Sequence, residues 1–92
     1  VGIHPMDIQL PVTEQTINEL IQITQSSTKV AVVSEVGLDF MEGMPARELQ
    51  YDAFRLQIRM AKILKLPIIF HSREADDETL RIIDEKNFEN IT

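Results

Sequence analysis

The sequence predicts an α/β fold in which parallel strands alternate with helices. Short apolar runs of strand length recur along the chain, each is followed by a segment with helical periodicity, and the connections between them are short. Repeated βα units of this kind form a parallel sheet with right-handed crossovers. The chain has 92 residues, 43% of them hydrophobic. It therefore holds at most one small domain, with too little volume for a large independent core.

The first half of the chain is expected to contain a strand end, a helix and a strand. "VGI" (residues 1–3) has the character of a strand already in progress, and residues 13–25 have the periodicity of an amphipathic helix. Thr16 and Glu19 stand in the register of a capping box. Residues 29–34 form an apolar run without alternation, which is typical of a strand covered on both faces. The apolar side of the helix is expected to consist of Ile17, Leu20, Ile21 and Thr24.

A long amphipathic helix is expected from about residue 46 to residue 65. Pro45 suits the first position of this helix, and Pro67 prevents the helix from continuing. One stripe of apolar side chains predicts its buried face. The stripe consists of Leu49, Ala53, Leu56, Met60 and Ile63, widened by Phe54, Ile58 and Ala61.

The last part of the chain predicts a further βα unit. "IIF" (residues 68–70) has the character of a second short buried strand. A third helix is expected to open at Asp76 and to end near Asn87, because acidic residues favour the first turn of a helix. Leu80 and Ile83 are expected on its inner face.

Three apolar runs each end in a polar side chain, namely His4, Glu35 and His71. Glu35 follows His4 by 31 residues and His71 follows Glu35 by 36, each about the length of one βα unit. Because parallel strands point their carboxyl ends the same way, we expect these side chains to converge at one rim. Each residue alone is more commonly a solvated or backbone-satisfied group. Together, two imidazoles and a carboxylate suit zinc, manganese or a related divalent ion.

Two further residues each allow two interpretations. Arg73 could hold a phosphate or carboxylate with two hydrogen bonds, or form a salt bridge to Glu74 or Asp77. Asp39 could orient a metal ligand by a hydrogen bond to that ligand, or it could cap the turn that follows Gly37. The residues alone leave both pairs of alternatives open.

Composition excludes several classes of protein. The formal charge of −6 argues against a basic nucleic-acid cradle, so phosphate chemistry would need a metal to supply positive charge. Without cysteine, neither disulfides nor thiolate zinc sites can form, which fits a reducing compartment, and we expect a cytoplasmic location. The apolar runs are too short for a membrane span, and residues 1–7 do not have the pattern expected of a signal peptide.

Four ordered motifs resemble those of the TatD-like DNases, a family of metal-dependent hydrolases on a TIM-type barrel. They are "VGIHP" (1–5), "SEVGLDF" (34–40), "DAFRLQIRMAKILKLP" (52–67) and "IIFHSREADDE" (68–78). The resemblance spans nearly the whole chain in the right order and spacing. It implies that residues 1–92 are a single partial domain, the middle segment of a (β/α)8 barrel with about three parallel βα units.

The resemblance also implies roles for individual residues. Glu35 matches a glutamate that coordinates and can bridge the metals, and His71 matches the histidine ligand of the "HSR" motif. By the same comparison, His4 lies beside the site and Arg73 contacts a substrate phosphate. A complete site would hold two divalent ions, Mg, Mn or Zn, and the substrate would be DNA.

This sequence departs from the family pattern in two ways. Ser34 stands where the family commonly has glycine, and Met6 where a second histidine is frequent. The family's His-x-His pair, a further histidine and a late aspartate, the natural general base, have no counterpart among these residues. We therefore expect this segment alone to bind metal weakly, to be inactive, and to self-associate through exposed strand edges.

Two other functions are compatible with the sequence. The chain could be a non-catalytic α/β module that acts through its edges in assembly, in which case a chelator would not affect its folding or oligomeric state. It could also be part of a related metallohydrolase that acts on a small ester or amide, since one scaffold supports several chemistries. The charge of −6 favours a small substrate, whereas the ordered motifs favour DNA.

Overall fold

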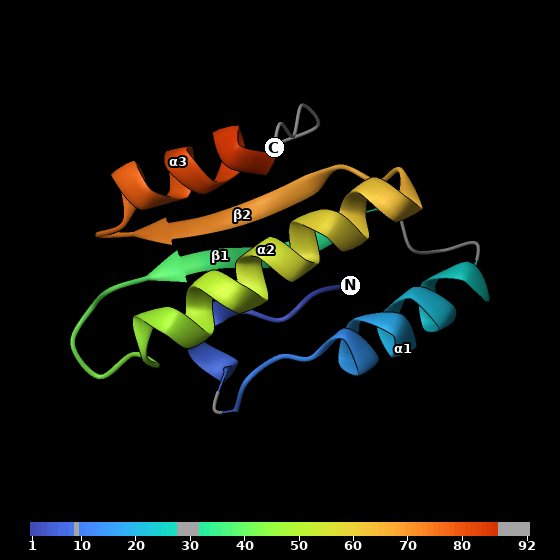
Figure 1. Ribbon diagram of the computed structural model, residues 1–92, viewed down its shortest axis with the longest axis horizontal. Helices are drawn as coiled ribbons and strands as arrows, with labels where there is room; N and C mark the ends of the chain where they lie inside the picture. The colour runs from blue at the N-terminus through green and yellow to red at the C-terminus, as the bar shows by residue number, and fades with distance from the viewer. Residues whose placement is uncertain (9, 28–31, 87–92) are drawn as a thin grey trace.

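The structure is a computed structural model that describes residues 1–8, 10–27 and 32–86. The predicted α/β class with parallel strands is confirmed, and helices and strands alternate along the chain (Figure 1). In chain order the elements are the 3₁₀ helix η1 (Pro5–Asp7), α1 (Glu14–Gln25), β1 (Val33–Asp39), α2 (Arg47–Leu64), β2 (Ile68–Arg73) and α3 (Asp76–Lys86).

Strands β1 and β2 pair in parallel, and the described part of the chain contains one sheet made of these two strands. Residues 1–3, predicted as a strand end, are not assigned as a strand, but they lie along the other edge of β1. The Val1 amino group donates to the Val32 carbonyl at 2.9 Å, and the Ser34 N–H donates to the Val1 carbonyl at 2.8 Å. The strand predicted at 29–34 begins later, at Val33, and residues 29–31 lie outside the described ranges.

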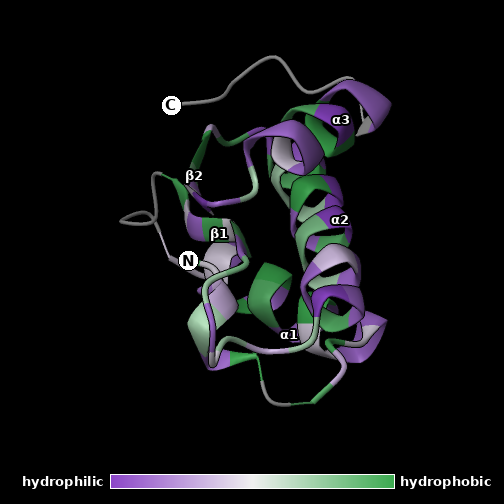
Figure 2. Ribbon diagram, turned by 90° about the vertical axis from the view of Figure 1, so that its left-hand side faces the viewer, coloured by the Kyte–Doolittle hydropathy of each residue, from purple (hydrophilic) through white to green (hydrophobic). Residues whose placement is uncertain are grey.

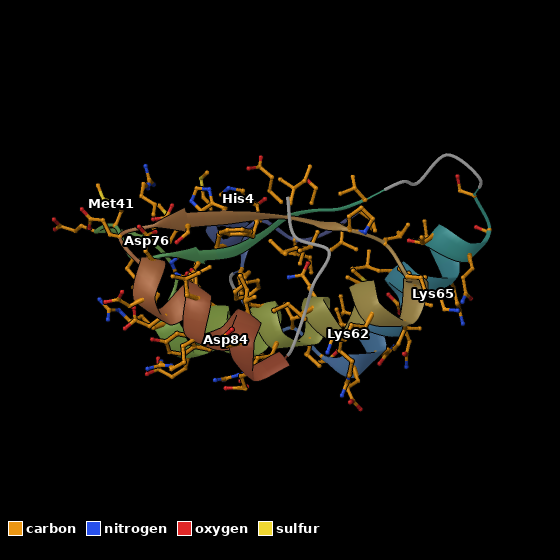
Figure 3. All side chains as sticks on the ribbon, turned by 90° about the horizontal axis from the view of Figure 1, so that it is seen from above. His4, Met41, Lys62, Lys65, Asp76 and Asp84 are labelled. Carbon is orange, nitrogen blue, oxygen red and sulfur yellow. The ribbon has the colours of Figure 1, made fainter. Side chains whose placement is uncertain are left out.

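The strands form one layer and the helices form the other (Figure 2). Helix α2 lies against β1, and α1 and α3 each contact α2. The core fills the space between the layers, and no α-helix of the described residues covers the opposite face of the sheet (Figure 3). The buried residues of the core are Ile17, Val33, Val36, Leu38, Phe54, Ile58, Met60, Ala61, Ile68, Ala75 and Ile82.

Two glutamines that the predicted stripe does not include are fully buried on α2. Gln57 accepts from the Ile3 N–H at 2.6 Å and donates to the Ile3 carbonyl at 3.4 Å. Gln50 accepts from the Asp39 N–H at 2.7 Å and donates to the Asp39 carbonyl at 2.8 Å. Ile63, predicted in the stripe, is 55% exposed. The buried face is therefore rotated from the predicted one, because the amides satisfy main-chain groups that water cannot reach.

Two helices begin within one residue of the predicted positions, but their first residues and caps differ from those predicted. The hydroxyl of Thr13 accepts from the Thr16 N–H at 3.3 Å, so Thr13 is the N-cap of α1 and Thr16 lies inside the helix. The predicted capping box at Thr16 is therefore wrong. Pro45 lies before α2, since Ala46, with a ψ of 140°, is the non-helical N-cap and the helix starts at Arg47.

The inner face of α3 also differs from the prediction. Leu80 is 60% exposed, whereas Thr79 and Ile82 are buried and Ile83 is partly buried. Thr79 takes an inward position because its hydroxyl lies 3.0 Å from the Ser72 hydroxyl, which satisfies a buried polar group. The placement of Leu80 on the inner face is therefore wrong, and that of Ile83 is confirmed in part.

Gly37 of β1 is paired with His71 of β2 and lies close to its main chain. A Cβ at Gly37 would overlap the His71 carbonyl oxygen, and its φ of +144° disfavours any side chain. Gly43 also has a positive φ, +88°, but a Cβ there would meet nothing within 4 Å. A substitution at Gly43 therefore adds backbone strain alone, whereas a substitution at Gly37 adds both backbone strain and steric overlap.

We predict that Gly37→Ala lowers the free energy of unfolding by about 1–3 kcal/mol more than Gly43→Ala does. Both variants incur the cost of a positive φ, but only the first pushes β2 away from β1. Urea titrations followed by circular dichroism would measure the difference. Equal losses in the two variants would contradict the close approach.

Candidate metal centre

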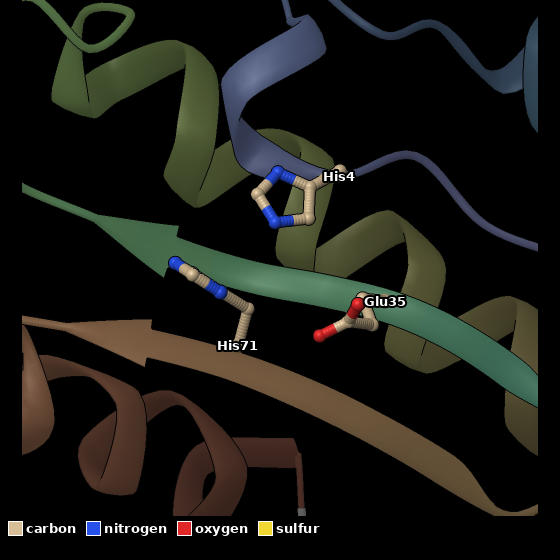
Figure 4. Close-up of side chains that lie close together, drawn as sticks. All are labelled: His4, Glu35 and His71. Atoms are coloured by element: carbon tan, nitrogen blue, oxygen red, sulfur yellow. The ribbon is translucent and has the colours of Figure 1, made fainter.

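Three side chains from separate segments gather on the open face of the sheet. His4, Glu35 and His71 each offer one ligand atom, and these atoms all lie within 4.8 Å of one another. Figure 4 shows the three side chains side by side, and Figure 3 shows His4 on the side of the sheet away from the helices. The predicted convergence is confirmed. The strands continue to Asp39 and Arg73, however, so Glu35 and His71 lie within strands and not beyond their ends.

A break in the register of β1 directs Glu35 towards the open face. Val33 pairs with Ile68 and Val36 pairs with Phe70, so three steps on β1 match two on β2. The extra residue allows both Val33 and Val36 to be buried, although regular alternation would place them on opposite faces. Glu35, between them, is exposed. Because of the bulge, residues 33–36 of β1 contribute Val33 and Val36 to the core and Glu35 to the site.

Asp39 lies behind His71 and is fully buried. The His71 Nε2 is 2.9 Å from the Asp39 Oδ2. Burial raises the pKa of Asp39, but hydrogen bonds from Arg73, Met41 and His71 outweigh it and lower the pKa from 3.8 to about 2. An ionised carboxylate only accepts hydrogen bonds, so Nε2 of His71 carries the proton. The lone pair of a neutral His71 is then on Nδ1, the nitrogen that remains for a ligand.

Arg73 also contacts the carboxylate of Asp39. Its Nε lies 3.1 and 3.0 Å from the two carboxylate oxygens, and its Nη2 lies 2.9 Å from Oδ2. The carboxylate that it contacts is Asp39, in place of the expected Glu74 or Asp77. Asp39 also accepts from the Met41 N–H at 3.1 Å. It therefore caps the turn and holds His71 at the same time.

His4 is oriented by the turn that follows it. Its Nδ1 accepts from the Met6 N–H at 3.1 Å, as the N-cap of η1. A neutral His4 in this arrangement carries its proton on Nε2 and presents a donor. The ring centroids of His4 and His71 are 4.6 Å apart. His4 thus lies against the site with a donor nitrogen, and it would have to give up the Met6 bond to become a ligand.

The residues fit a divalent metal ion. Ligand atoms on one such ion are at most about 4.2 Å apart, twice a typical metal–ligand distance. The ligand atoms of this group lie within 4.8 Å of one another, which is slightly wider. Small rotations of the side chains would bring these atoms within the distance that one ion requires. A carboxylate behind a histidine ligand, as Asp39 stands behind His71, is the usual support of such a site.

Within the described ranges, no helix has the length and apolar character that a membrane span requires.

Fold and site together define an α/β protein with a candidate divalent-metal centre on the face of a parallel sheet. Comparison with known proteins gives the family. The chain belongs to the TatD related DNase family, whose model matches residues 1–92.

Curated relatives agree with this assignment. A metal-dependent hydrolase of Buchnera aphidicola is 35% identical over 92 residues, covering 96% of this chain and 35% of the relative. YabD of Bacillus subtilis, also named a metal-dependent hydrolase, is 32% identical over 99% of this chain and 35% of its own length. The 3'-5' ssDNA/RNA exonuclease TatD of a Pantoea species is 37% identical over 89% of this chain and 31% of its own length. The chain spans about a third of these relatives.

The lowered pKa of Asp39 predicts a loss of stability in acid. Because the folded pKa, about 2, lies below the ordinary 3.8, the carboxylate stabilises the fold fully above about pH 4. The protein should lose about 2 kcal/mol of this contribution as the pH falls from 4 to 2. Asp39→Asn should remove this part of the pH dependence, whereas Asp52→Asn, at an exposed site on α2, should retain it. Urea titrations at several pH values would show whether the two variants differ in this way.

Proposed function

We propose that this chain is part of a metal-dependent hydrolase that cleaves phosphodiester bonds in nucleic acid, with DNA as the substrate class. The observation that carries the proposal is the His71 ring, which an ionised and buried Asp39 holds with Nδ1 left for a ligand, beside the exposed carboxylate of Glu35. Membership of the TatD related DNase family supports a hydrolase that uses metal. A cytoplasmic location is part of this proposal.

In this proposal Glu35 and His71 hold divalent metal, with two ions, Mg, Mn or Zn, in a complete site. Bound metal would supply an activated water and would stabilise charge on the phosphate. The residues of this chain have separate tasks. Glu35 contributes charge, His71 contributes the ring nitrogen Nδ1, and Asp39 fixes the tautomer and the orientation of that ring.

His4 and Arg73 are proposed to contact the substrate phosphate. The hydrogen bond from Met6 leaves His4 with a donor at Nε2, which suits a phosphate oxygen. The Arg73 side chain is 49% exposed although it contacts Asp39. Relatives named 3'-5' ssDNA/RNA exonucleases support a single-stranded substrate.

We further propose that residues 1–92 form a partial barrel of about three βα units. The chain spans 35% of its Buchnera relative and 31% of its Pantoea relative. Beside β2 lies a hollow of about 180 Å³. It is lined by Phe70, Ser72, Asp76, Thr79 and Leu80. Leu80 is exposed at its edge, in a position that the next βα unit of a barrel would cover. Alone, the same surface and the strand edges would favour self-association.

The charge of −6 favours a second candidate, a related enzyme acting on a small ester or amide. The two candidates differ in their substrates. Hydrolysis of single-stranded DNA, with simple esters left intact under the same conditions, would support the nuclease; the reverse would support the second candidate.

We predict that Glu35→Gln and His71→Gln, each in the protein at its natural length, lower metal-dependent cleavage of single-stranded DNA by more than about a hundredfold. Either change removes one proposed metal ligand. Glu42→Gln, in the exposed loop after β1, is the matched control and should retain activity. Release of nucleotides from a labelled oligonucleotide would measure the rates. Full activity in either ligand variant would contradict the proposed site.

We also predict that residues 1–92 alone bind Mn²⁺ weakly and do not cleave DNA. They supply two proposed ligands, whereas catalytic sites commonly have three or more. Titration with Mn²⁺ and a nuclease assay on the same preparation would test this. Turnover by the isolated segment that is lost in Glu35→Gln would contradict the prediction, since that variant excludes contaminating nucleases.

A further inference from the structure

We infer that Arg73 couples the binding of a substrate phosphate to the strength of the metal centre, acting through Asp39 on His71. The inference rests on the proposed function and adds a link between its two sites. It assigns Arg73 a positioning role in addition to contact with the phosphate.

The first step is that Asp39 is shared between two partners. Its Oδ2 lies 2.9 Å from Nε2 of His71 and 2.9 Å from Nη2 of Arg73. Its side chain is 1% exposed, so water does not compete for the same oxygens. A carboxylate that gives part of its charge to a guanidinium gives less to an imidazole. The strength of the hydrogen bond between Asp39 and His71 therefore depends on how strongly Arg73 interacts with the same carboxylate.

The second step is that Arg73 can reach a second anion. The contacts with Asp39 use Nε and Nη2. Among the contacts of the described residues, none involves Nη1, and the side chain is 49% exposed. A guanidinium has five donors in a planar fork, so it can bridge a carboxylate and a phosphate. A phosphate at Nη1 would draw the guanidinium away from the carboxylate.

The third step connects the phosphate to the metal. When Arg73 turns towards a phosphate, Asp39 directs more of its charge to the His71 N–H. A stronger acceptor behind a histidine raises the basicity of its other nitrogen. His71 then becomes a better metal ligand through Nδ1. Linkage makes the effect reciprocal, so a bound metal ion strengthens phosphate binding by the same factor.

Arg47 provides a contrast because it lies near the residue that follows β1. Its guanidinium lies 4.1 Å from the centroid of the Phe40 ring. It thus carries the same charge near the end of β1 but contacts an aromatic ring and not Asp39. A general effect of positive charge would be shared by Arg47, whereas coupling through Asp39 would be confined to Arg73.

The test measures Mn²⁺ affinity by electron paramagnetic resonance of free Mn²⁺, with and without saturating dimethyl phosphate, in the protein at its natural length. Dimethyl phosphate is a phosphodiester anion that resists hydrolysis. In the parent protein it should tighten Mn²⁺ binding by about fivefold or more. Arg73→Gln should reduce this ratio towards one, and Arg47→Gln should leave it as in the parent.

Arg73→Lys is the second variant, in case Arg73→Gln does not fold. It keeps the charge beside Asp39 but lacks the fork that bridges two anions, so it should also show a reduced ratio. A ratio as large as the parent's in a folded Arg73 variant would overturn the inference and leave the proposed function intact. No Mn²⁺ binding that depends on Glu35 and His71 would overturn both.

Discussion

The buried negative charge of Asp39 is the constraint on which this structure depends most. An uncompensated carboxylate in the interior costs several kcal/mol, so donors have to be brought to it. They come from two places, β2 through His71 and Arg73 and the turn after β1 through Met41. The register of the two strands and the course of the turn are therefore linked to one side chain. The orientation of His71, on which the proposed chemistry relies, follows from the same requirement.

The main chain of the site is held by a different device, the buried amides of α2. Gln57 pairs both main-chain groups of Ile3, and Gln50 pairs both main-chain groups of Asp39. Each amide thus does what a neighbouring strand would do for that residue. Helix α2 fixes where Asp39 stands, and Arg73 fixes where its carboxylate points. Apolar packing alone would leave the helix freer to rotate and slide along the sheet.

The order of elements and the meeting of His4, Glu35 and His71 could be predicted from the sequence. Both depend on properties of the sequence itself, namely the period of the apolar residues and the length of a βα unit. The parallel direction of the strands then makes residues far apart in the chain neighbours in space. The bulge at Glu35 was not predictable in this way, because a bulge is a property of two paired strands.

The buried glutamines and the exposed Leu80 show where reading one chain segment at a time fails. Hydrophobicity places Gln50 and Gln57 on the outside and Leu80 on the inside, and the structure reverses all three. The amides are buried because main-chain groups on other elements need partners, which only the assembled fold shows. The one available signal was their spacing, seven residues or two helical turns, within the apolar phase of α2.

The electrostatics of the site explain how an acidic chain could act on an anion. Arg73 compensates Asp39, so in the proposed site without metal the carboxylate of Glu35, which is exposed, faces an incoming phosphate. A phosphate would be repelled until a divalent ion reverses the sign. Part of any linkage between metal and phosphate is therefore direct attraction across an exposed face, which salt screens. The contacts of Asp39 lie within the protein, where screening is weak, so this end of the path is less sensitive to salt than the exposed contact between Arg73 and a phosphate.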